Sequence, residues 1–141
     1  YCAGVTFPYI NATDKSQNFK EYYEKFATIW NKKDIAIICG ERVFKNIKYN
    51  IFNCANSIEY LYTKSKNAFD DYNDILTQAK KISKNKTIII ILGPTATVLA
   101  YDLALLGYRA IDIGHIAKDY DAWMKNLPSN TKIITEFFNP D

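Results

Sequence analysis

Apolar residues along this chain follow two periods, one typical of strands and one typical of helices. The continuous apolar runs at 35–40 (IAIICG) and 87–92 (TIIIIL) are bounded by charged or glycine residues, so they predict buried strands. The shorter run at 109–113 (RAIDI) predicts a third strand. Residues 57–62 (SIEYLY) suit a fourth strand, although a short helix fits nearly as well. Runs that are apolar on both faces are typical of strands covered by helices on both sides.

Between these runs the apolar residues recur at helical spacing. Helices are expected at residues 19–30, 69–82, 95–106 and 120–124. Ser16 is placed to cap the first of them, and Gly107 suits a left-handed cap at the end of the third. Residues 41–56 are expected to be irregular, and residues 131–138 (TKIITEFF) are expected to form a last strand or a tail.

Strands that alternate with amphipathic helices predict an α/β fold with a mostly parallel sheet flanked by helices. At 141 residues, the chain is expected to be one domain, 1–141. It begins YCAGVTF without an initiator Met, and Val5 and Phe7 suit the end of a strand already under way. We therefore expect an N-terminal segment of the natural protein to precede Tyr1.

Composition excludes some classes of function. Hydrophobic residues make up 48% and charged residues 23%, which is typical of a globular chain. The net charge of +3 comes with scattered lysines, so nucleic acid is not an expected partner. Cys2, Cys39 and Cys54 follow no metal-binding spacing, and we expect reduced thiols and a cytoplasmic location. The apolar runs are too short for a membrane span. The eleven tyrosines suit a cleft for sugars or bases, or simply half-buried positions at the edge of the core.

The turn after the clearest strand suggests an anion site. Gly93 closes the strand, Pro94 suits the first turn of a helix, and Thr95 and Thr97 are cap-type residues. Free N–H groups at a helix start favour phosphate, and ligands of parallel sheets bind beyond the carboxyl ends of the strands. Asp112 follows Gly93 by nineteen residues, close to the spacing at which an acidic residue meets a ribose hydroxyl. The alternative is a plain helix cap, with Asp112 hydrogen-bonded to a loop, because GPTAT matches neither GxGxxG nor a P-loop.

Further polar residues are expected at the same edge of the sheet. His115, the only histidine, follows Gly114 and could bind phosphate or act as an acid–base group. If the sheet is parallel, Glu41 and Arg42 also lie there, where Arg42 could pair with phosphate and Glu41 could orient a hydroxyl. The alternatives are a loop histidine satisfied by its surroundings and solvated charges.

The string ILGPTATVLAYDLALLGYRAIDIGHI, residues 91–116, strongly resembles the signature of the GT-D type glycosyltransferase family, once known as a domain of unknown function. The segments DKSQ, IWNKKDIAIICGE, KNAFDDYNDIL and KDYDAW also resemble family segments and occur in the family's order. The resemblance covers most of the chain from Asp14 to Trp123. It is far more specific than any short motif above.

The resemblance implies a Rossmann-like fold that binds a nucleotide sugar. It also implies an enzyme that transfers a hexose, with glucose as the first candidate, from a UDP-sugar to a glycan or glycoprotein acceptor in bacterial surface glycoprotein or polysaccharide synthesis. Together with the reasoning above, it assigns nucleotide-sugar binding to Gly93, Pro94, Thr95, Thr97, Asp112, Gly114 and Arg42, and catalysis to His115 and Glu41.

The chain departs from the family in its metal motif. The resemblance implies a divalent ion, Mn²⁺ or Mg²⁺, held by an Asp-X-Glu motif, and these 141 residues contain no Asp-X-Glu. The nearest string is DYD, Asp119 to Asp121, which we do not equate with it. We expect the metal ligands to lie upstream of Tyr1. Residues 41–53 also depart from the family's glycine-rich loop, so we expect the chain alone to bind nucleotide weakly and to turn over little.

Two other functions remain open from the sequence. A Rossmann-like module could bind a nucleotide or a protein partner without turnover, which the missing Asp-X-Glu favours. An oxidoreductase or methyltransferase would use a different nucleotide cofactor, although the missing GxGxxG argues against it.

Overall fold

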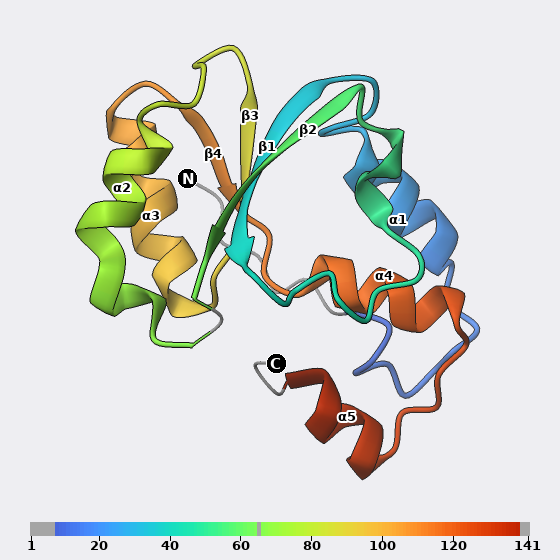
Figure 1. The fold of residues 1–141 in the computed structure, drawn as a ribbon. Coiled ribbons are helices and arrows are strands. Elements are labelled where there is room, and N and C mark those ends of the chain that lie inside the picture. Colours follow the sequence, from blue (N-terminus) through green and yellow to red (C-terminus); the bar gives the residue numbers. More distant parts are fainter. Residues whose placement is uncertain (1–7, 65, 139–141) are drawn as a thin grey trace.

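A computed structural model of the chain describes residues 8–64 and 66–138, so the strand end expected at Val5 and Phe7 lies outside the described residues. Within them, one sheet lies between two layers of helices (Figure 1). The strands are β1 (Asp34–Gly40), β2 (Ser57–Thr63), β3 (Thr87–Ile91) and β4 (Arg109–Asp112). The predicted α/β class is confirmed.

The four strands are all parallel and lie in the order β2-β1-β3-β4. Ile37, in the middle of β1, pairs with Tyr60 of β2 on one side and with Ile89 of β3 on the other. Residues 57–62 are therefore a strand and not a helix, and the parallel sheet expected from the sequence is confirmed. Each strand differs from its predicted range by one residue at one end.

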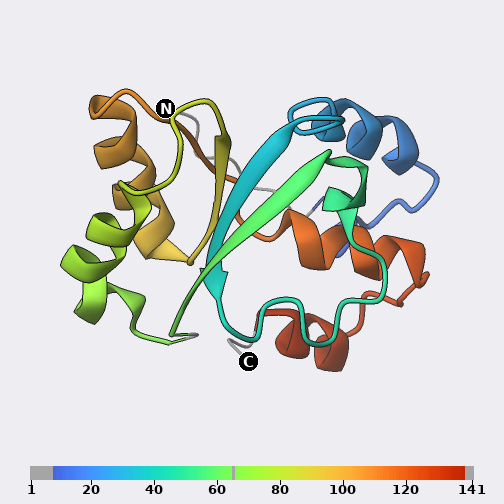
Figure 2. The ribbon, with the colours of Figure 1, turned by 45° about the horizontal axis from the view of Figure 1, so that its top comes forward.

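Helices cover both faces of this sheet (Figures 1 and 2). The elements are α1 (Phe19–Ala27), η1 (Ile51–Cys54), η2 (Ala68–Asp71), α2 (Tyr72–Ala79), α3 (Pro94–Leu105), α4 (Ile116–Met124) and α5 (Thr131–Phe138). One face carries α2 and α3, and the other carries α1, η1 and α4. In the part of the chain that the structure describes, no helix is long and apolar enough to cross a membrane.

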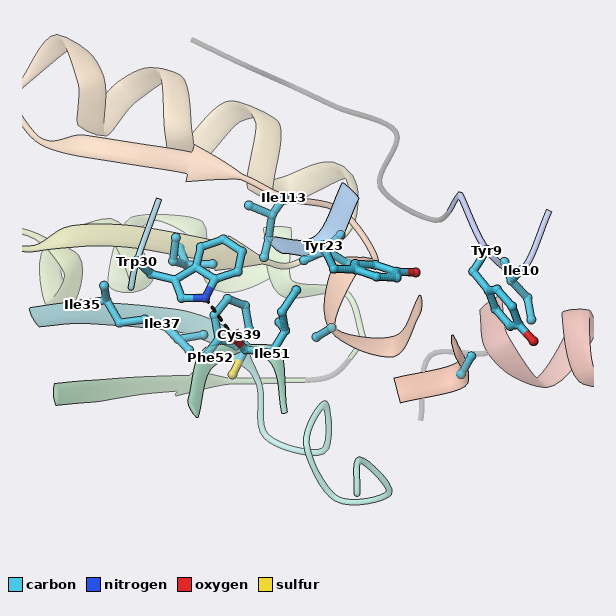
Figure 3. Packing of buried hydrophobic residues seen from close by; sticks show 14 of the residues in the cluster. Tyr9, Ile10, Tyr23, Trp30, Ile35, Ile37, Cys39, Ile51, Phe52 and Ile113 are labelled. Atoms are coloured by element: carbon cyan, nitrogen blue, oxygen red, sulfur yellow. Dashed lines mark hydrogen bonds between the residues drawn. The ribbon is translucent and has the colours of Figure 1, made fainter. Parts of the chain in front are cut away.

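Side chains of β1 alternate between two hydrophobic clusters, as the period of a strand requires. Ile35 and Ile37 face the cluster under α1 and α4, whereas Ala36 and Ile38 face the cluster under α2 and α3. Figure 3 shows the first cluster, in which the indole of buried Trp30 donates a 3.0 Å hydrogen bond to the carbonyl of Ile51. Strand β1 is therefore packed against a hydrophobic cluster on each face of the sheet.

Several helix ends differ from the sequence prediction. The N-cap of α1 is Asn18, whose side chain accepts the N–H of Glu21 at 3.1 Å, because the Ser16 hydroxyl instead bonds to Asp14 at 2.6 Å. The helix ends at Ala27 and continues to Trp30 only as a turn.

The two C-terminal helices differ more from the sequence prediction. The helix expected at 120–124 begins earlier, at Ile116, because the chain turns directly from Gly114 and His115 into its first turn. The prediction of a strand or tail at 131–138 was wrong. These residues form α5, since Phe137 then packs into the first cluster together with Ile133 and Ile134 at helical spacing.

The strand order β2-β1-β3-β4 means that β2 is added on one side of β1, whereas β3 and β4 are added on the other. The order along the chain therefore switches between β1 and β3, and a crevice is expected at their carboxyl ends. After β1, the chain leaves toward the face that carries η1, and after β3 it enters α3 on the opposite face. Doubly wound sheets bind their ligands at such a switch point, outside the carboxyl ends of the strands. The fold therefore indicates where a site should lie before any side chain is considered.

Candidate functional site

A pocket of about 650 Å³ lies at this switch point, within the size range of small-molecule sites. Its floor is formed by Gly40 at the end of β1 and by Ile91 and the residues that follow β3. The loop after β2 lines it from one edge of the sheet, and the start of α4, which follows the other edge strand β4, lines it together with the end of α5. The lining residues are Gly40, Val43, Lys64, Lys66, Asn67, Ala68, Phe69, Ile91, Leu92, Gly93, Pro94, Thr95, Gly114, His115, Ala117, Lys118 and Phe138.

The Gly-Pro-Thr turn brings the start of α3 to this pocket. Gly93, the N-cap, has φ of 55° and ψ of −139°, a conformation that costs other residues free energy. A Cβ at Gly93 would meet nothing within 4 Å, so conformation and not space calls for glycine here. Pro94 has no N–H, and the N–H of Ala96 donates to the carbonyl of Gly93 at 3.0 Å. The amide of Thr95 lies in the first turn, where an α-helix offers no carbonyl partner.

This turn offers an anion fewer N–H donors than a glycine-rich loop would, but lysines from two other segments line the same pocket. Lys64 and Lys66 come from the loop after β2, and Lys118 comes from α4. Lys64 forms a 2.8 Å ion pair with Asp71, and Lys118 donates to the carbonyl of Phe137 at 3.4 Å. These lysines were not predicted from the sequence, because Lys118 is far along the chain from Lys64 and Lys66 and only the topology brings them to one pocket.

His115, the N-cap of α4, lines the pocket from the segment after β4, whereas Lys64 follows β2, the strand at the other edge of the sheet. Its ring centre is 5.6 Å from that of Phe137 and 5.3 Å from that of Phe138. Burial lowers the pKa of His115, the charge of Lys118 lowers it further, and Asp112 partly opposes both. The ring is therefore neutral near pH 7 and can accept a proton.

Thr97 and Asp112, both expected at a nucleotide, hydrogen-bond to each other. The Thr97 hydroxyl donates to Asp112 at 2.8 Å, and the N–H of Gly114 donates to the same carboxylate at 3.1 Å. Neither Thr97 nor Asp112 lines the pocket. These contacts fix the turn that carries Gly114 and His115, which is the alternative that the sequence left open for Asp112. A contact from Asp112 to a ribose stays a prediction.

Glu41 and Arg42 lie at the carboxyl end of β1 but outside this pocket. Glu41 is exposed and lines a separate pocket of about 240 Å³ beside Asp71 and Asp74, and Lys64 lines both pockets. Arg42 is exposed and lines neither of them. The structure thus brings together Gly93, Pro94, Thr95, Gly114 and His115 from the predicted set, and it separates Glu41, Arg42, Thr97 and Asp112 from them.

The carboxylates of the DYD string do not fit a divalent metal ion. Asp119 is buried and accepts the N–H groups of Tyr9 and Ile10, each at 3.0 Å, together with the hydroxyl of Tyr23. Burial raises the pKa of Asp119, although these donors oppose the shift.

The carboxylate of Asp121 also has partners within the chain. It accepts the N–H groups of Lys48 and Tyr49 at 3.0 and 2.9 Å and pairs with Lys125 at 2.6 Å. Both carboxylates therefore hold segments of the chain together. Within residues 8–64 and 66–138, no group of three or more His, Cys, Asp or Glu is arranged to hold a metal.

A family model described as the glycosyltransferase GT-D fold matches residues 1–140. Two curated relatives are similar to the chain over 92% of its length. One is the glycosyltransferase GlyD of Streptococcus pneumoniae serotype 4, with 36% identity over 129 residues. The other is the probable glycosyl transferase Gly of Streptococcus gordonii, with 37% identity over 133 residues.

Two solved structures have the same fold. One, of the domain of unknown function 1792, is described as having a distinct glycosyltransferase fold; it is 40% identical to this chain and covers 84% of it, with a TM-score of 0.79. The other, a glycosyltransferase (DUF1792) from Streptococcus sanguinis, is 35% identical and covers 87%, with a TM-score of 0.80. The chain spans 43% and 45% of these solved chains, and only 16% and 19% of the curated relatives.

Proposed function

Because this chain belongs to the GT-D family of glycosyltransferases, we propose that its switch-point pocket binds the nucleotide-sugar donor, with the diphosphate at the start of α3. The donor that we propose is a UDP-sugar, with glucose as the first sugar to test. The acceptor that we propose is a glycan or glycoprotein of the bacterial surface, and the place of the reaction is the cytoplasm. The observation that carries the proposal is the coincidence, in one pocket, of a helix start, a neutral histidine and three lysines from two segments.

The chemistry requires a site that stabilises a leaving diphosphate. When the bond between the sugar's anomeric carbon and the diphosphate oxygen breaks, negative charge grows on that oxygen. Lys64, Lys66 and Lys118 line the pocket from two sides, and the Thr95 amide adds a donor at the helix start. These groups would hold the diphosphate in place and stabilise that charge.

The acceptor hydroxyl must lose a proton as it attacks. His115, whose lowered pKa leaves it neutral, is the group in this pocket suited to take it. Glu41, across Lys64 in the neighbouring pocket, would instead orient an acceptor hydroxyl. The Mn²⁺ or Mg²⁺ ion expected for the family finds no matching ligands in Asp119 and Asp121, so no step here depends on it.

The single histidine makes the proposal testable by NMR, because its ring signals need no assignment in an untagged chain. In the free chain we expect a titration midpoint below the usual value of about 6.5. Saturating UDP or UDP-glucose should raise that midpoint, because a nearby negative charge favours the protonated ring. By linkage, UDP should bind more tightly as the pH falls through the raised pKa.

NAD at the same concentration serves as the control ligand and should leave the midpoint unchanged. A response to NAD but not to UDP would favour an oxidoreductase. If neither ligand moves the signals of His115, the proposed donor site is wrong.

The same shift in pKa sets the sign of the pH effect on folding. Because the folded-state pKa of His115 is lowered, its contribution to stability is present above about pH 6.5 and is lost as pH falls through the folded-state pKa.

A further inference from the structure

The loop between β2 and α2 presents an exposed aromatic ring to the donor pocket. Phe69, on η2, keeps 59% of its surface exposed, yet it lines the pocket beside Asn67. A single exposed aromatic residue is ordinary at a protein surface. Phe69 differs from such a residue because it lines a 650 Å³ pocket together with the amide side chain of Asn67.

The ring of Phe69 is supported from behind. Its centre lies 5.3 Å from that of Tyr72, at an interplanar angle of 31°, and the Tyr72 hydroxyl donates a hydrogen bond to Asp102 of α3. Tyr72 is thereby tied to the helix whose first turn borders the pocket. A ring held in this way loses little conformational freedom when a flat ligand stacks on it, which is the basis of aromatic stacking platforms.

Asn67 adds hydrogen-bonding groups of both kinds beside this ring. It adopts a left-handed conformation, with φ of 54° and ψ of 39°, and its carbonyl accepts the N–H of Asp70 at 3.0 Å. This turn leaves the Asn67 side chain exposed in the wall of the pocket. Its amide offers a donor and an acceptor, as the edge of a nucleobase requires.

The opposite wall has a different chemistry. It presents His115 and Lys118, and its aromatic residue Phe138 already contacts the ring of His115. An acid–base group and a cation suit the reacting end of a donor, whereas an aromatic ring with an amide suits its base. The start of α3 lies between the two walls.

We propose that Phe69 and Asn67 form the nucleobase subsite of the donor pocket, so that the base stacks on Phe69 and the sugar points toward His115. This assignment rests on the proposed donor site. It orients the nucleotide in the pocket and makes Phe69 a determinant of nucleotide affinity.

The test compares UDP with inorganic pyrophosphate in calorimetric titrations of the whole chain, because pyrophosphate lacks a base. Phe69→Ala should weaken UDP binding by about tenfold or more, as expected for the loss of one base-stacking contact. Its affinity for pyrophosphate should stay within about twofold of wild type, and Phe69→Trp should restore UDP binding. Tyr62→Ala removes an aromatic residue of similar exposure, 55%, that does not line this pocket, so it should change neither affinity.

The outcomes separate this assignment from the donor site itself. Unchanged UDP affinity in Phe69→Ala would overturn the base subsite and leave the donor site standing. Equal losses for UDP and pyrophosphate would also overturn it, because they would report a general change in the pocket. If the wild-type chain bound neither ligand, the donor site and the base subsite would both fall.

Discussion

Replacing Asp119 with alanine should lower the free energy of unfolding by about 4 kcal/mol, since buried donors left without a partner cost about 1–3 kcal/mol each. The carboxylate accepts two backbone N–H groups, from Tyr9 and Ile10, and the hydroxyl of Tyr23. Asp119 itself has no exposed surface, so water cannot replace it without opening the core. A loss of this size approaches the whole stability of many domains, about 5–15 kcal/mol.

Urea denaturation followed by tryptophan fluorescence measures this effect. Asp119→Asn keeps one accepting oxygen and should lose less, which keeps the test informative if the alanine variant does not fold. Glu24→Ala, at an exposed position beyond the first turn of α1, is the matched control and should change stability by less than about 0.5 kcal/mol. A loss below about 1 kcal/mol in Asp119→Ala would show that the carboxylate does not hold the chain near Tyr9.

A glutamate at position 94 should weaken UDP binding by at least about tenfold relative to a glutamine there, a difference of about 1.4 kcal/mol. Pro94 lines the proposed donor pocket and is the first residue of α3. A carboxylate at this position would repel a bound diphosphate, and the repulsion should weaken as salt is added. Both variants lack the proline, so the difference in UDP affinity between Pro94→Glu and Pro94→Gln measures the effect of the negative charge.

Stability should change in the opposite direction. A negative charge in the first turn of a helix is favourable by about 0.3–1 kcal/mol, so Pro94→Glu should be at least as stable as Pro94→Gln. Weaker binding in a chain of equal or greater stability cannot be attributed to unfolding. Equal UDP affinity in the two variants would place the diphosphate away from the start of α3.

The strands and the long helices could be predicted because their apolar spacing coincides with what the core requires. For α5 the apolar spacing did not decide between a strand and a helix, because TKIITEFF has the β-branched residues of a strand and the i, i+4 spacing of a helix. Packing of Phe137 into the core settles the choice, and that contact is long-range. Ser16 was predicted to cap α1, but its hydroxyl bonds to Asp14 and Asn18 caps the helix instead, a local competition that residue preference alone does not resolve.

The candidate site was predicted in part, for a similar reason. Gly93, Pro94 and Thr95 follow a strand whose end could be seen in the sequence, and they line the pocket. The lysines and Phe69 come from segments whose relation to that strand depends on sheet order, which the sequence did not supply. Had the order β2-β1-β3-β4 been known, the loop after β2 would have been placed beside the switch point.

Mapping the backbone amide shifts of the chain during a UDP titration tests the central claim most directly. We predict the largest changes at Gly93, Thr95 and Gly114, which surround the switch point, with further changes at Asn67 and Phe69. Pyrophosphate should reproduce the first group and not the second. Changes confined to other residues, or none at saturating UDP, would contradict a donor site at the start of α3.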